Sequence, residues 1–581
     1  MTVLDPTCGS GAFLFAALNI LEPLYEACLD RMEEMNAANP NLFKAELEEI
    51  AGKFRSNRKY FVYKNIILRN LYGVDIMHEA TEIARLRLFL KMVAVVDVDR
   101  HDPNLGLDPL PDIDFNIRCG NTLVGYATEK EIQDGLVNGD MFAYVELKKR
   151  IEDEMTKASA AFDYFRREQL NLLGSHADLI KAKKEINQRL ATIRTLLDRQ
   201  LYATNGGGKT YDQWHKDTQP FHWYTEFYPV MAQRGGFDVI IGNPPYVVYT
   251  KKDRKSGKSL SDIYRIDGYA TLCSNNLYAF TLERCLRLSC FGRHIGMIVP
   301  LSFAAAKNMF GLRNQYSASS ELYVSTFEIR PAKLFDGDSG ADQRLNIVLR
   351  HESGHPAVYT TGVLRWHNEQ RQLLFPSIYY TKSITSERIA RFSSCVEFQI
   401  QRKFCREEPI SLCYSSVAGQ GAIHYRSAGL RYWIIFVTQG FGTESASNKC
   451  KFVSDSSMAK QLVAALNSDL YWWYYSTNFD MFNQTDANVG GFRYTFKKSR
   501  ELELLADELE TDMNRNKVSS VVEKSNGGVS RSFAYDKKKS KPIIDKIDEL
   551  LAKHYGLTEE ELDFIINYDI KYRMGDELNG G

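Results

Sequence analysis

A four-residue stretch near the middle of the chain combines an amide, two prolines and an aromatic ring. It reads Asn243-Pro244-Pro245-Tyr246 and directly follows a predicted strand over residues 237–241. The exocyclic amine of a nucleobase is a poor nucleophile because its lone pair is delocalised into the ring. Two fixed carbonyl acceptors, the Asn243 side chain and the Pro244 backbone, would localise that lone pair on the nitrogen. The stretch is therefore suited to activating an amine for attack on an electrophilic methyl group.

The Tyr246 ring fits the same chemistry because it can stack on a base, an interaction that contributes about 1–3 kcal/mol. The four residues also fit an ordinary proline turn that leaves a strand. The stretch alone does not decide between a site and a turn, so a second signal is needed.

The start of the chain supplies that signal. Residues 2–4 predict a short buried strand, and residues 5–11 read D-P-T-C-G-S-G, a glycine-rich turn before a helix. Glycines let the backbone approach a ligand that a side chain would block. Asp75 ends a second predicted strand, where a carboxylate can accept both hydroxyls of a ribose. Together these features predict a site for an adenosine-bearing cofactor.

The segments around these residues predict a parallel, doubly wound α/β sheet, because strands and helices alternate along the chain. Apolar residues recur at helical spacing after the first turn, at Phe13, Leu14, Ala17, Leu18 and Leu21. The helix after Asp75 is expected to bury Ile83, Leu86 and Leu90.

With these residues identified, the chain resembles the class I S-adenosylmethionine-dependent N6-adenine DNA methyltransferases, in the large form found in type IIG restriction-modification and BREX-type phage-defence enzymes. Residues 5–13 match the first motif of that family, and residues 243–246 match its catalytic motif. The stretch FNIRCGNTLVG resembles the strand whose polar residue meets the cofactor adenine. The resemblance spans almost the whole chain, including LDFIINYDIKYRM near the C-terminus.

The resemblance implies a fold, a cofactor and a set of site residues. The fold is a Rossmann-like methyltransferase sheet with a helical insertion, followed by an α+β target-recognition domain and terminal helices. The cofactor is S-adenosyl-L-methionine, and no metal is involved. The implied cofactor contacts are Asp5, Pro6, Thr7, Cys8, Gly9, Gly11, Phe13, Asp75, Ile76 and Asn121. The implied catalytic residues are Asn243, Pro244, Pro245 and Tyr246.

The resemblance also implies double-stranded DNA as the partner, with the target adenine flipped out of the duplex. Phe335 is the expected second aromatic on the base, although a core phenylalanine fits that position equally. A charge run follows the catalytic motif where a phosphate backbone would lie. Its members are Lys251, Lys252, Arg254, Lys255 and Lys258, and a solvated loop is the alternative interpretation.

We expect a methyltransferase domain over residues 1–350, a target-recognition domain over residues 351–500 and a helical C-terminal segment over residues 501–581. A helical insertion is predicted at about residues 127–220. It includes a hairpin that either touches DNA or a partner or is simply tolerated between strands. Its turn is expected at residues 172–176 and its apolar stripe at Ile186, Leu190, Ile193 and Leu197.

Weaker local patterns complete the map. The loop NGGGK at residues 205–209 is a poor phosphate-loop signal, because it lacks the preceding strand and the following helix. A hairpin is predicted over residues 332–350 and a solvated stretch over residues 514–541. Two short helices should close the chain, the second with a capping box formed by Thr558 and Glu561.

Composition sets broad limits. The 581 residues are 44% hydrophobic, which disfavours disorder, and 73 basic residues balance 73 acidic ones, so any DNA-binding surface must be local. The ten cysteines form no C-x-x-C pair, which is typical of free thiols. No signal peptide or apolar run of membrane-spanning length is evident, so we expect a cytoplasmic protein.

Two questions stay open at the level of sequence. Relatives in this family carry a segment before the first motif, and many carry a nuclease, but no P-D…E-x-K pattern occurs here. We therefore expect an upstream polypeptide or a longer enzyme, with a truncated gene product as the alternative. The rival functions are RNA or protein amine methylation, a non-catalytic specificity subunit, and a remnant that only binds DNA.

Overall fold

The computed structural model describes residues 1–53, 57–97, 111–136, 141–170, 176–335, 343–384, 387–428, 433–442, 445–523 and 529–575. The chain divides into two compact units. The first comprises Met1–Phe303, Asn308–Tyr323 and Leu345–Ala357, and the second comprises Ala304–Lys307, Val324–Arg344 and Val358–Gly581.

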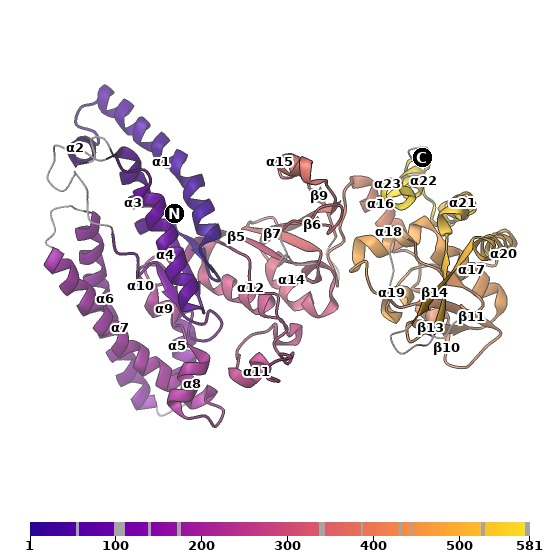
Figure 1. Cartoon of the computed structure of the whole chain (residues 1–581), viewed down its shortest axis with the longest axis horizontal. Coiled ribbons are helices and arrows are strands. Elements are labelled where there is room, and N and C mark those ends of the chain that lie inside the picture. The colour runs from indigo at the N-terminus through magenta and orange to yellow at the C-terminus, as the bar shows by residue number, and fades with distance from the viewer. Residues whose placement is uncertain are drawn as a thin grey trace. The chain divides into compact units, whose positions relative to one another are not determined.

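A large, mostly parallel sheet organises the chain (Figure 1). Its strands in chain order are β1 (Val3–Asp5), β2 (Leu71–Asp75), β3 (Ile117–Cys119), β4 (Phe237–Gly242), β5 (Ser289–Pro300), β6 (Ser320–Phe327), β7 (Leu345–Glu352), β8 (Ala357–Leu364) and β9 (Thr381–Lys382). Their spatial order is β3-β2-β1-β4-β5-β7-β6-β8-β9. The run from β3 to β5 is parallel, whereas β7 is antiparallel to β5. The mixed α/β fold predicted from strand and helix alternation is confirmed.

The helices up to β6 are α1 (Ala12–Ala38), α2 (Lys44–Lys53), α3 (Arg58–Arg69), α4 (His78–Val93), α5 (Glu129–Leu136), α6 (Met141–Leu170), α7 (His176–Asn205), α8 (Tyr211–Thr218), α9 (Trp223–Glu226), α10 (Tyr228–Met231), α11 (Leu260–Ile263), α12 (Leu277–Leu288), α13 (Ser302–Ala305) and α14 (Phe310–Ser317). Alternation along β2 separates the two faces of the sheet. Leu71 packs in the core formed with α1, α3 and α4. The next residue, Tyr72, contacts the ring of Phe227, with the ring centroids 5.6 Å apart.

The expected apolar face of α4 is wrong. Ile83, Leu86 and Leu90 are 48%, 55% and 58% exposed, and the buried side chains are Thr81, Ala84, Leu88 and Met92. The helix carries two apolar stripes, and the stripe that contains Ala84 faces inward. The space between α4 and Gly11 is small, because a Cβ added at Gly11 would lie only 3.0 Å from the Ala84 Cβ. A side chain larger than alanine at position 84 could not pack against Gly11.

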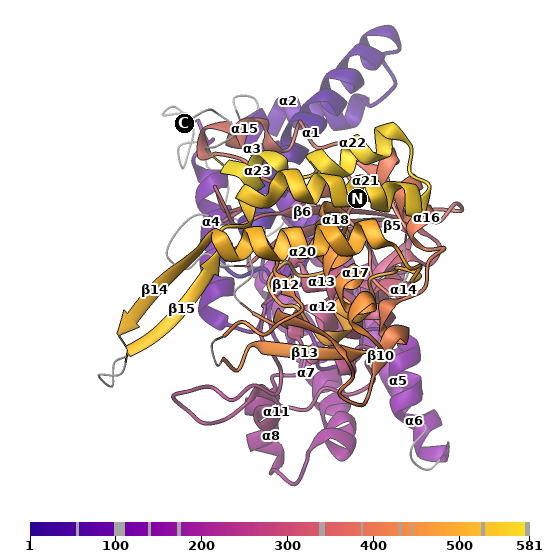
Figure 2. The ribbon, with the colours of Figure 1, turned by 90° about the vertical axis from the view of Figure 1, so that its right-hand side faces the viewer.

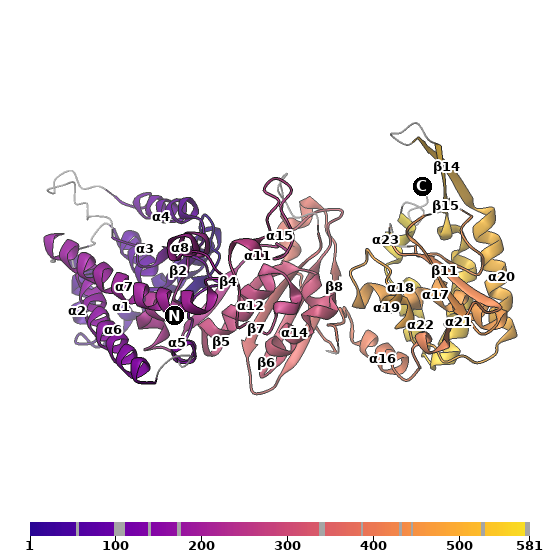
Figure 3. The same cartoon turned by 90° about the horizontal axis from the view of Figure 1, so that it is seen from below.

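The predicted helical insertion is present as the long helices α6 and α7, which run side by side (Figures 1 and 3). The predicted turn between them lies outside the described residues except for His176. The stripe expected on the second helix is fully buried, at Ile186, Leu190, Ile193 and Leu197. Lys183 also pairs with Asp112 and Asp114 before β3, so the hairpin is fastened to the sheet.

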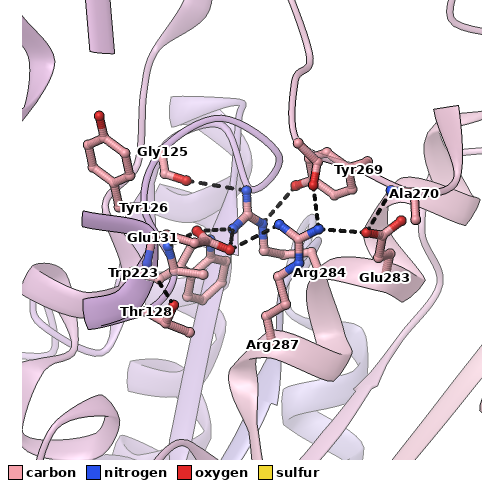
Figure 4. Close-up of polar contacts among 12 residues, drawn as sticks. Gly125, Tyr126, Thr128, Glu131, Trp223, Tyr269, Ala270, Glu283, Arg284 and Arg287 are labelled. Carbon is pink, nitrogen blue, oxygen red and sulfur yellow. Dashed lines mark hydrogen bonds and ion pairs between the residues drawn. The ribbon is translucent and has the colours of Figure 1, made fainter. Parts of the chain in front are cut away.

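A buried arginine fastens the loop after β3 to α12 (Figure 4). Arg284 is 3% exposed and donates to the carbonyls of Leu123 (3.0 Å) and Gly125 (3.2 Å). It also donates to the Tyr269 hydroxyl (2.7 Å) and forms an ion pair with Glu131 (3.1 Å). Breaking such a buried pair typically costs about 3–5 kcal/mol, so this contact fixes the loop firmly.

The hairpin predicted over residues 332–350 is wrong. Only its second strand forms: β7 begins at Leu345 and pairs with β5, with Leu345 opposite Pro300. Residues 331–335 form no strand, and residues 336–342 lie outside the described part of the chain. Pro331 has no backbone N–H to donate, which disfavours a paired strand there.

The second unit has α+β structure (Figure 1). Its helices are α15 (Arg371–Leu374), α16 (Cys395–Phe404), α17 (Ser456–Asn467), α18 (Asp469–Asn478), α19 (Asp486–Gly490), α20 (Arg500–Arg515), α21 (Lys541–Tyr555), α22 (Glu559–Asn567) and α23 (Ile570–Met574). A four-stranded sheet contains β10 (Tyr414–Ser415), β11 (Gly421–Arg426), β12 (Phe436–Val437) and β13 (Asn448–Val453). The predicted capping box of Thr558 and Glu561 is confirmed at the start of α22.

The stretch expected to be solvated over residues 514–541 instead contains two paired strands, β14 (Lys517–Glu523) and β15 (Val529–Tyr535). They form a ribbon that projects from its unit (Figures 2 and 3). Alternating Val, Ser and aromatic residues have strand propensity, which the polar composition of the whole stretch hid.

One helix, α1, is long and apolar enough by composition to span a membrane, which the sequence analysis did not anticipate. In this structure, however, Leu14, Leu18 and Leu21 of α1 pack in the core of the sheet. The apolar stretch of α1 is 28% buried in the structure, and a single helix of this kind is weak evidence for a membrane span.

Candidate functional site

The predicted site residues of the first unit lie at one edge of the sheet. β1 pairs in parallel with β2 on one side and with β4 on the other, with Asp5 opposite Gly73 and Leu4 opposite Ile240. The carboxyl ends of parallel strands meet at the same edge. Asp5, Asp75 and the stretch that begins at Asn243 therefore leave the sheet side by side, which brings together the two signals that the sequence placed far apart.

The turn after β1 depends on two glycines with left-handed backbone. Gly9 has φ +51° and Gly11 has φ +79°. A Cβ at Gly9 would meet no atom within 4 Å, so the turn leaves open space on that side. Gly11 is the N-cap of α1 and lies against Ala84. Gly9 thus provides the open face that a ligand needs, and Gly11 provides the close packing of α1 on α4.

Asp75 holds this turn as well as facing it. One carboxylate oxygen accepts a hydrogen bond from the Gly9 N–H and the other accepts one from the Met77 N–H, both at 2.9 Å. Each oxygen keeps a second lone pair, and the side chain is half-buried. The carboxylate is therefore oriented by backbone donors and still has two acceptor positions to offer, one on each oxygen.

Asp5 lies deeper, with a side chain that is 1% exposed. Burial, with a contribution from the charge of Asp75, raises the pKa of the Asp5 carboxyl to about 7, against a bond from the Thr7 N–H that lowers it. Gly242 makes room for this carboxyl, because a Cβ there would lie 2.8 Å from the Asp5 Oδ1. Asp5 thus acts as a buried support of the turn with a carboxyl that titrates near neutrality.

Two polar groups of the turn have different surroundings. The Thr7 hydroxyl is buried and has no hydrogen-bond partner among the described residues, as a group that awaits a ligand would. The Pro6 carbonyl accepts a bond from the Thr122 hydroxyl, which fastens the turn to the loop after β3.

The remaining residues of the expected cofactor set have different surroundings. Cys8 is buried, and burial raises the pKa of its thiol well above the ordinary value, so the thiol is a neutral packing group. Phe13 is half-buried on the first turn of α1, and Ile76 is 40% exposed after Asp75. Ile76 therefore offers an apolar surface beside the Asp75 carboxylate.

In Asn121, both ends of the side-chain amide form hydrogen bonds within the protein. It is 3% exposed, its amide nitrogen donates to the Thr218 carbonyl (3.1 Å), and its oxygen accepts from the Leu123 N–H (3.0 Å). These bonds shape the turn after β3. A contact with the cofactor adenine through Asn121 stays a prediction.

The turn after β4 places Asn243 and Tyr246 in direct contact. The Tyr246 hydroxyl lies within hydrogen-bonding distance of the Asn243 side-chain oxygen and of the Ile298 carbonyl, the latter at 3.1 Å. Burial, followed by repulsion from Tyr278, holds the pKa of Tyr246 well above its ordinary value, so the hydroxyl stays a donor. Pro244 is buried and Pro245 is exposed. The arrangement fixes the direction of the Asn243 amide. The sequence analysis assigned only a stacking role to Tyr246 and did not predict this hydrogen bond.

The backbone after Tyr246 is held by the start of α12. Leu277 N–H donates to the Val247 carbonyl and Tyr249 N–H donates to the Asn275 carbonyl, both at 3.0 Å. Because Arg284 on the same helix binds the loop after β3, α12 supports both the Asn243 turn and the loop that carries Thr122.

The basic loop over residues 251–258 is held by hydrogen bonds, and its basic side chains are exposed. Asp253 accepts bonds from the backbone N–H groups of Lys255 (3.0 Å) and Ser256 (2.8 Å), which closes a tight turn. The five predicted cations are all exposed, and none forms an ion pair with a residue that the structure describes: Lys251, Lys252, Arg254, Lys255 and Lys258. The loop therefore offers exposed positive charge that begins at Lys251, three residues after Val248, with Asp262 close to Lys252 and Lys258.

Two other expectations have distinct outcomes. Lys209 of the glycine loop forms an ion pair with Asp217 (2.7 Å) and donates to the Ile263 carbonyl, so it holds its own loop and not a phosphate. Phe335 is half-buried and belongs to the second unit. Its role as the second aromatic on a base stays a prediction.

The structure adds three residues that sequence reasoning missed: Met77, Thr122 and Gly242. A glycine at the end of a strand, directly before the Asn243 stretch, was a usable signal of close approach. Thr122 follows Asn121 in the same stretch and could have been included. The Met77 contribution is a backbone N–H, which residue identity cannot reveal.

Comparison with known proteins gives family matches over residues 1–334. Residues 69–334 match the family model of the Eco57I restriction-modification methylase, and residues 1–127 match that of the MmeI DNA-methyltransferase domain. A Methanocaldococcus jannaschii protein named as a type II restriction enzyme and methyltransferase is 26% identical over 350 residues, which are 54% of this chain. The match covers 27% of that relative, so the chain spans about a quarter of the relative's length.

Solved structures of restriction-modification enzymes are also similar. The type IIL enzyme MmeI in complex with DNA aligns at a TM-score of 0.43 and 11% identity, over 100% of this chain and 73% of that chain. The DrdV–DNA complex aligns at a TM-score of 0.38 and 9% identity, over 88% of this chain and 54% of that chain.

The two glycines of the turn should respond differently to alanine. Left-handed backbone costs alanine about 1–2 kcal/mol, so both Gly9→Ala and Gly11→Ala should lower the free energy of unfolding. Gly11→Ala should lower it by about 1–3 kcal/mol more, because its Cβ is forced against Ala84. Thermal and urea unfolding measure the difference.

The matched control is Gly311→Ala in α14, where φ is ordinary and a Cβ meets no atom within 4 Å. This change should be neutral or stabilising by about 0.5–1 kcal/mol. Equal losses for Gly9→Ala and Gly11→Ala would show that the contact between Gly11 and Ala84 is unimportant.

Proposed function

We propose that this chain, whose residues 1–334 carry restriction-modification methylase domains of the Eco57I and MmeI kinds, transfers a methyl group from S-adenosyl-L-methionine to the N6 amine of adenine in DNA. One observation carries the proposal. The Asn243 amide, directed by Tyr246, leaves the sheet at the same edge as the glycine turn and the oriented Asp75 carboxylate.

The residues at this edge fit the proposed cofactor. The open face of Gly9, the unpaired Thr7 hydroxyl and the two free acceptor positions of Asp75 would receive its adenosine and polar groups. When bound, S-adenosyl-L-methionine supplies an electrophilic methyl group on a positively charged sulfur. The apolar side chain of Ile76 would lie beside the ribose acceptor.

Asn243 activates the acceptor amine in this proposal. Its side-chain oxygen and the Pro244 carbonyl each accept one N–H of the amine, which localises the nitrogen lone pair and aims it at the methyl carbon. The activated nitrogen would take the methyl group from the sulfur in a single displacement, and the amine would then lose one proton to solvent. Fixed acceptors of this kind need no reorganisation during the reaction.

Access to the amine requires an extruded base, because N6 is paired inside a duplex. The Tyr246 ring would stack on the flipped adenine. The exposed cations of residues 251–258 would contact the DNA backbone, since they face solvent and follow the Asn243 turn. Residues 351–500 stay the proposed reader of the target sequence, and an upstream polypeptide with a nuclease stays a proposed partner.

The function is tested by transfer of labelled methyl groups to unmethylated genomic DNA, with RNA and total protein as alternative acceptors. N6-methyladenine in the DNA digest is the expected product. Label in RNA or protein but not in DNA would replace the proposed substrate. Tests with and without the product of the neighbouring upstream reading frame show whether this chain acts alone.

Replacing Asn243 by alanine should separate catalysis from cofactor binding. Asn243→Ala removes one of two fixed acceptors, so methyl transfer should fall by about 100-fold or more, while the dissociation constant of the cofactor changes little. Calorimetry and single-turnover methylation measure the two effects. The control Asn314→Ala alters an exposed side chain of α14. Parallel loss of both properties would contradict the catalytic assignment.

Changing Asp75 to asparagine should have the opposite signature. Asp75→Asn removes the charge and one acceptor oxygen, so cofactor affinity should fall by about tenfold or more, whereas the rate at saturating cofactor should be nearly preserved. Glu79→Gln, an exposed change on the first turn of α4, is the matched control. Unchanged affinity in Asp75→Asn would exclude a ribose contact.

Tyr246 can be divided into its ring and its hydroxyl. Tyr246→Phe keeps the stacking ring but releases the Asn243 amide, so the single-turnover rate should fall by about three- to tenfold. Tyr246→Ala also loses stacking and should weaken transfer by a further 1–3 kcal/mol, about five- to 150-fold. The exposed Tyr379→Phe serves as a control. A wild-type rate in Tyr246→Phe would remove the orienting role of the hydroxyl.

A further inference from the structure

A polar cavity of about 570 Å³ lies beside β3, the edge strand of the sheet. Its wall is formed by the end of β3 and by α4, α7, α8 and the segment before α9. The basic side chains that line it are Arg85, Arg118, Arg194, His215 and Lys216. The carboxylates that line it are Asp114, Asp198 and Glu226.

Each carboxylate that lines the cavity is shared between two basic groups, and Arg85 has a further carboxylate partner in Glu82 (2.7 Å). Glu226 pairs with Arg118 and Arg194, and it is only 3% exposed. Asp198 lies 3.1 Å from the His222 ring nitrogen and 3.2 Å from that of His215. Asp114 is similarly shared between Arg85 (3.3 Å) and Lys183.

The cluster around Glu226 carries the clearest imbalance. One carboxylate faces two guanidinium groups, so these three side chains have a net charge of +1, which the nearby Asp198 partly offsets at Arg194. Arg118 is 5% exposed, and its Nη2 is buried without a hydrogen-bond partner in the part of the chain that the structure describes. A buried charge without full compensation is costly.

The same imbalance affects proton affinity. Burial, followed by repulsion from Arg194 and Arg85, holds the pKa of the Arg118 guanidinium well below its ordinary value. Burial likewise lowers the pKa of Arg194. Both guanidinium groups would be stabilised by an additional negative charge in the cavity.

Two cations can reach such a charge. The Arg194 side chain is 41% exposed, although it lies on the cavity wall and is paired with Glu226. Lys216 is exposed and forms no ion pair with any residue within the described ranges. Arginine and lysine together are typical of phosphate sites, where one contributes a planar pair of donors and the other a point charge.

We propose that this cavity binds a phosphate-bearing ligand of up to nucleotide size, with Arg194 and Lys216 as its direct contacts and the Glu226 cluster as the source of positive potential. The cavity also includes Phe115 and Phe221, which provide an apolar wall for the part of the ligand beyond the phosphate. No residue of the Gly9 turn lines the cavity, although Gly120 of the lining donates to the Asp75 carbonyl (2.9 Å), and the proposal does not rest on methyl transfer.

The proposal is tested by calorimetric titration of the full chain with inorganic phosphate and with ribose 5-phosphate, neither of which contains adenosine. Saturable binding is expected for both, with ribose 5-phosphate the tighter of the two because it fills more of the cavity. Arg194→Gln and Lys216→Gln should each weaken binding by about tenfold or more. Arg194→Gln leaves Glu226 paired with Arg118, so the buried carboxylate does not become isolated.

Lys181→Gln is the matched control, because Lys181 is an exposed lysine on the same helix as Arg194 and does not line the cavity. Its phosphate affinity should equal that of the unaltered chain. Lys216→Gln keeps the test decisive if Arg194→Gln folds poorly, since an exposed lysine side chain is readily replaced. Absence of saturable binding, or equal weakening by Lys181→Gln, would overturn the proposal.

Competition identifies the source of the phosphate. A DNA duplex without adenine that displaces bound phosphate in the unaltered chain would support the proposal with a nucleic-acid backbone as the occupant. Retention of bound phosphate in the presence of duplex would support it with a free small molecule as the occupant.

Discussion

The parallel pairing of β1 with both β2 and β4 is the constraint on which the rest of the site depends. The strand has only three residues, all buried, yet its two neighbours bring Asp75 and Asn243 to the edge where Asp5 begins the glycine turn. Asp75 lies 70 positions after Asp5, and Asn243 lies a further 168 positions along the chain. Because strand pairing fixes the spacing between neighbouring chains at about 5 Å, the site inherits its dimensions from the backbone. Side chains then refine it, as Gly242 does by leaving room for the Asp5 carboxyl.

Helix α12 gives the two halves of this edge a common support. Its first residues hold the backbone after Tyr246, and its buried Arg284 holds the loop that carries Thr122. Thr122 in turn holds the Pro6 carbonyl. The glycine turn and the Asn243 turn are therefore connected through one rigid helix as well as through the sheet.

The sequence predicted the parts of the site where the backbone geometry requires particular residue types. It did not predict features that depend on how side chains pack in three dimensions. Glycines at positive φ, a carboxylate after a strand and two prolines identified the edge of the sheet, because few other residues suit those positions. The inward face of α4 could not be predicted from hydrophobicity. Ile83, Leu86 and Leu90 are more hydrophobic than Ala84, but their side chains are too large to pack against Gly11. The bond between Tyr246 and Asn243 was also hidden, because an aromatic ring suggests stacking before it suggests a hydroxyl donor.

The contact of Tyr246 with two acceptors changes how a ligand can enter the site. The hydroxyl has a single hydrogen, and it lies near both the Asn243 oxygen and the Ile298 carbonyl. The Asn243 oxygen has two lone pairs, so it can keep the bond from Tyr246 and still accept one from an incoming donor. The Ile298 carbonyl of β5 holds the same hydroxyl from the other side. One end of the Asn243 amide is therefore fixed by the sheet, and the acceptor position it offers does not have to be vacated first.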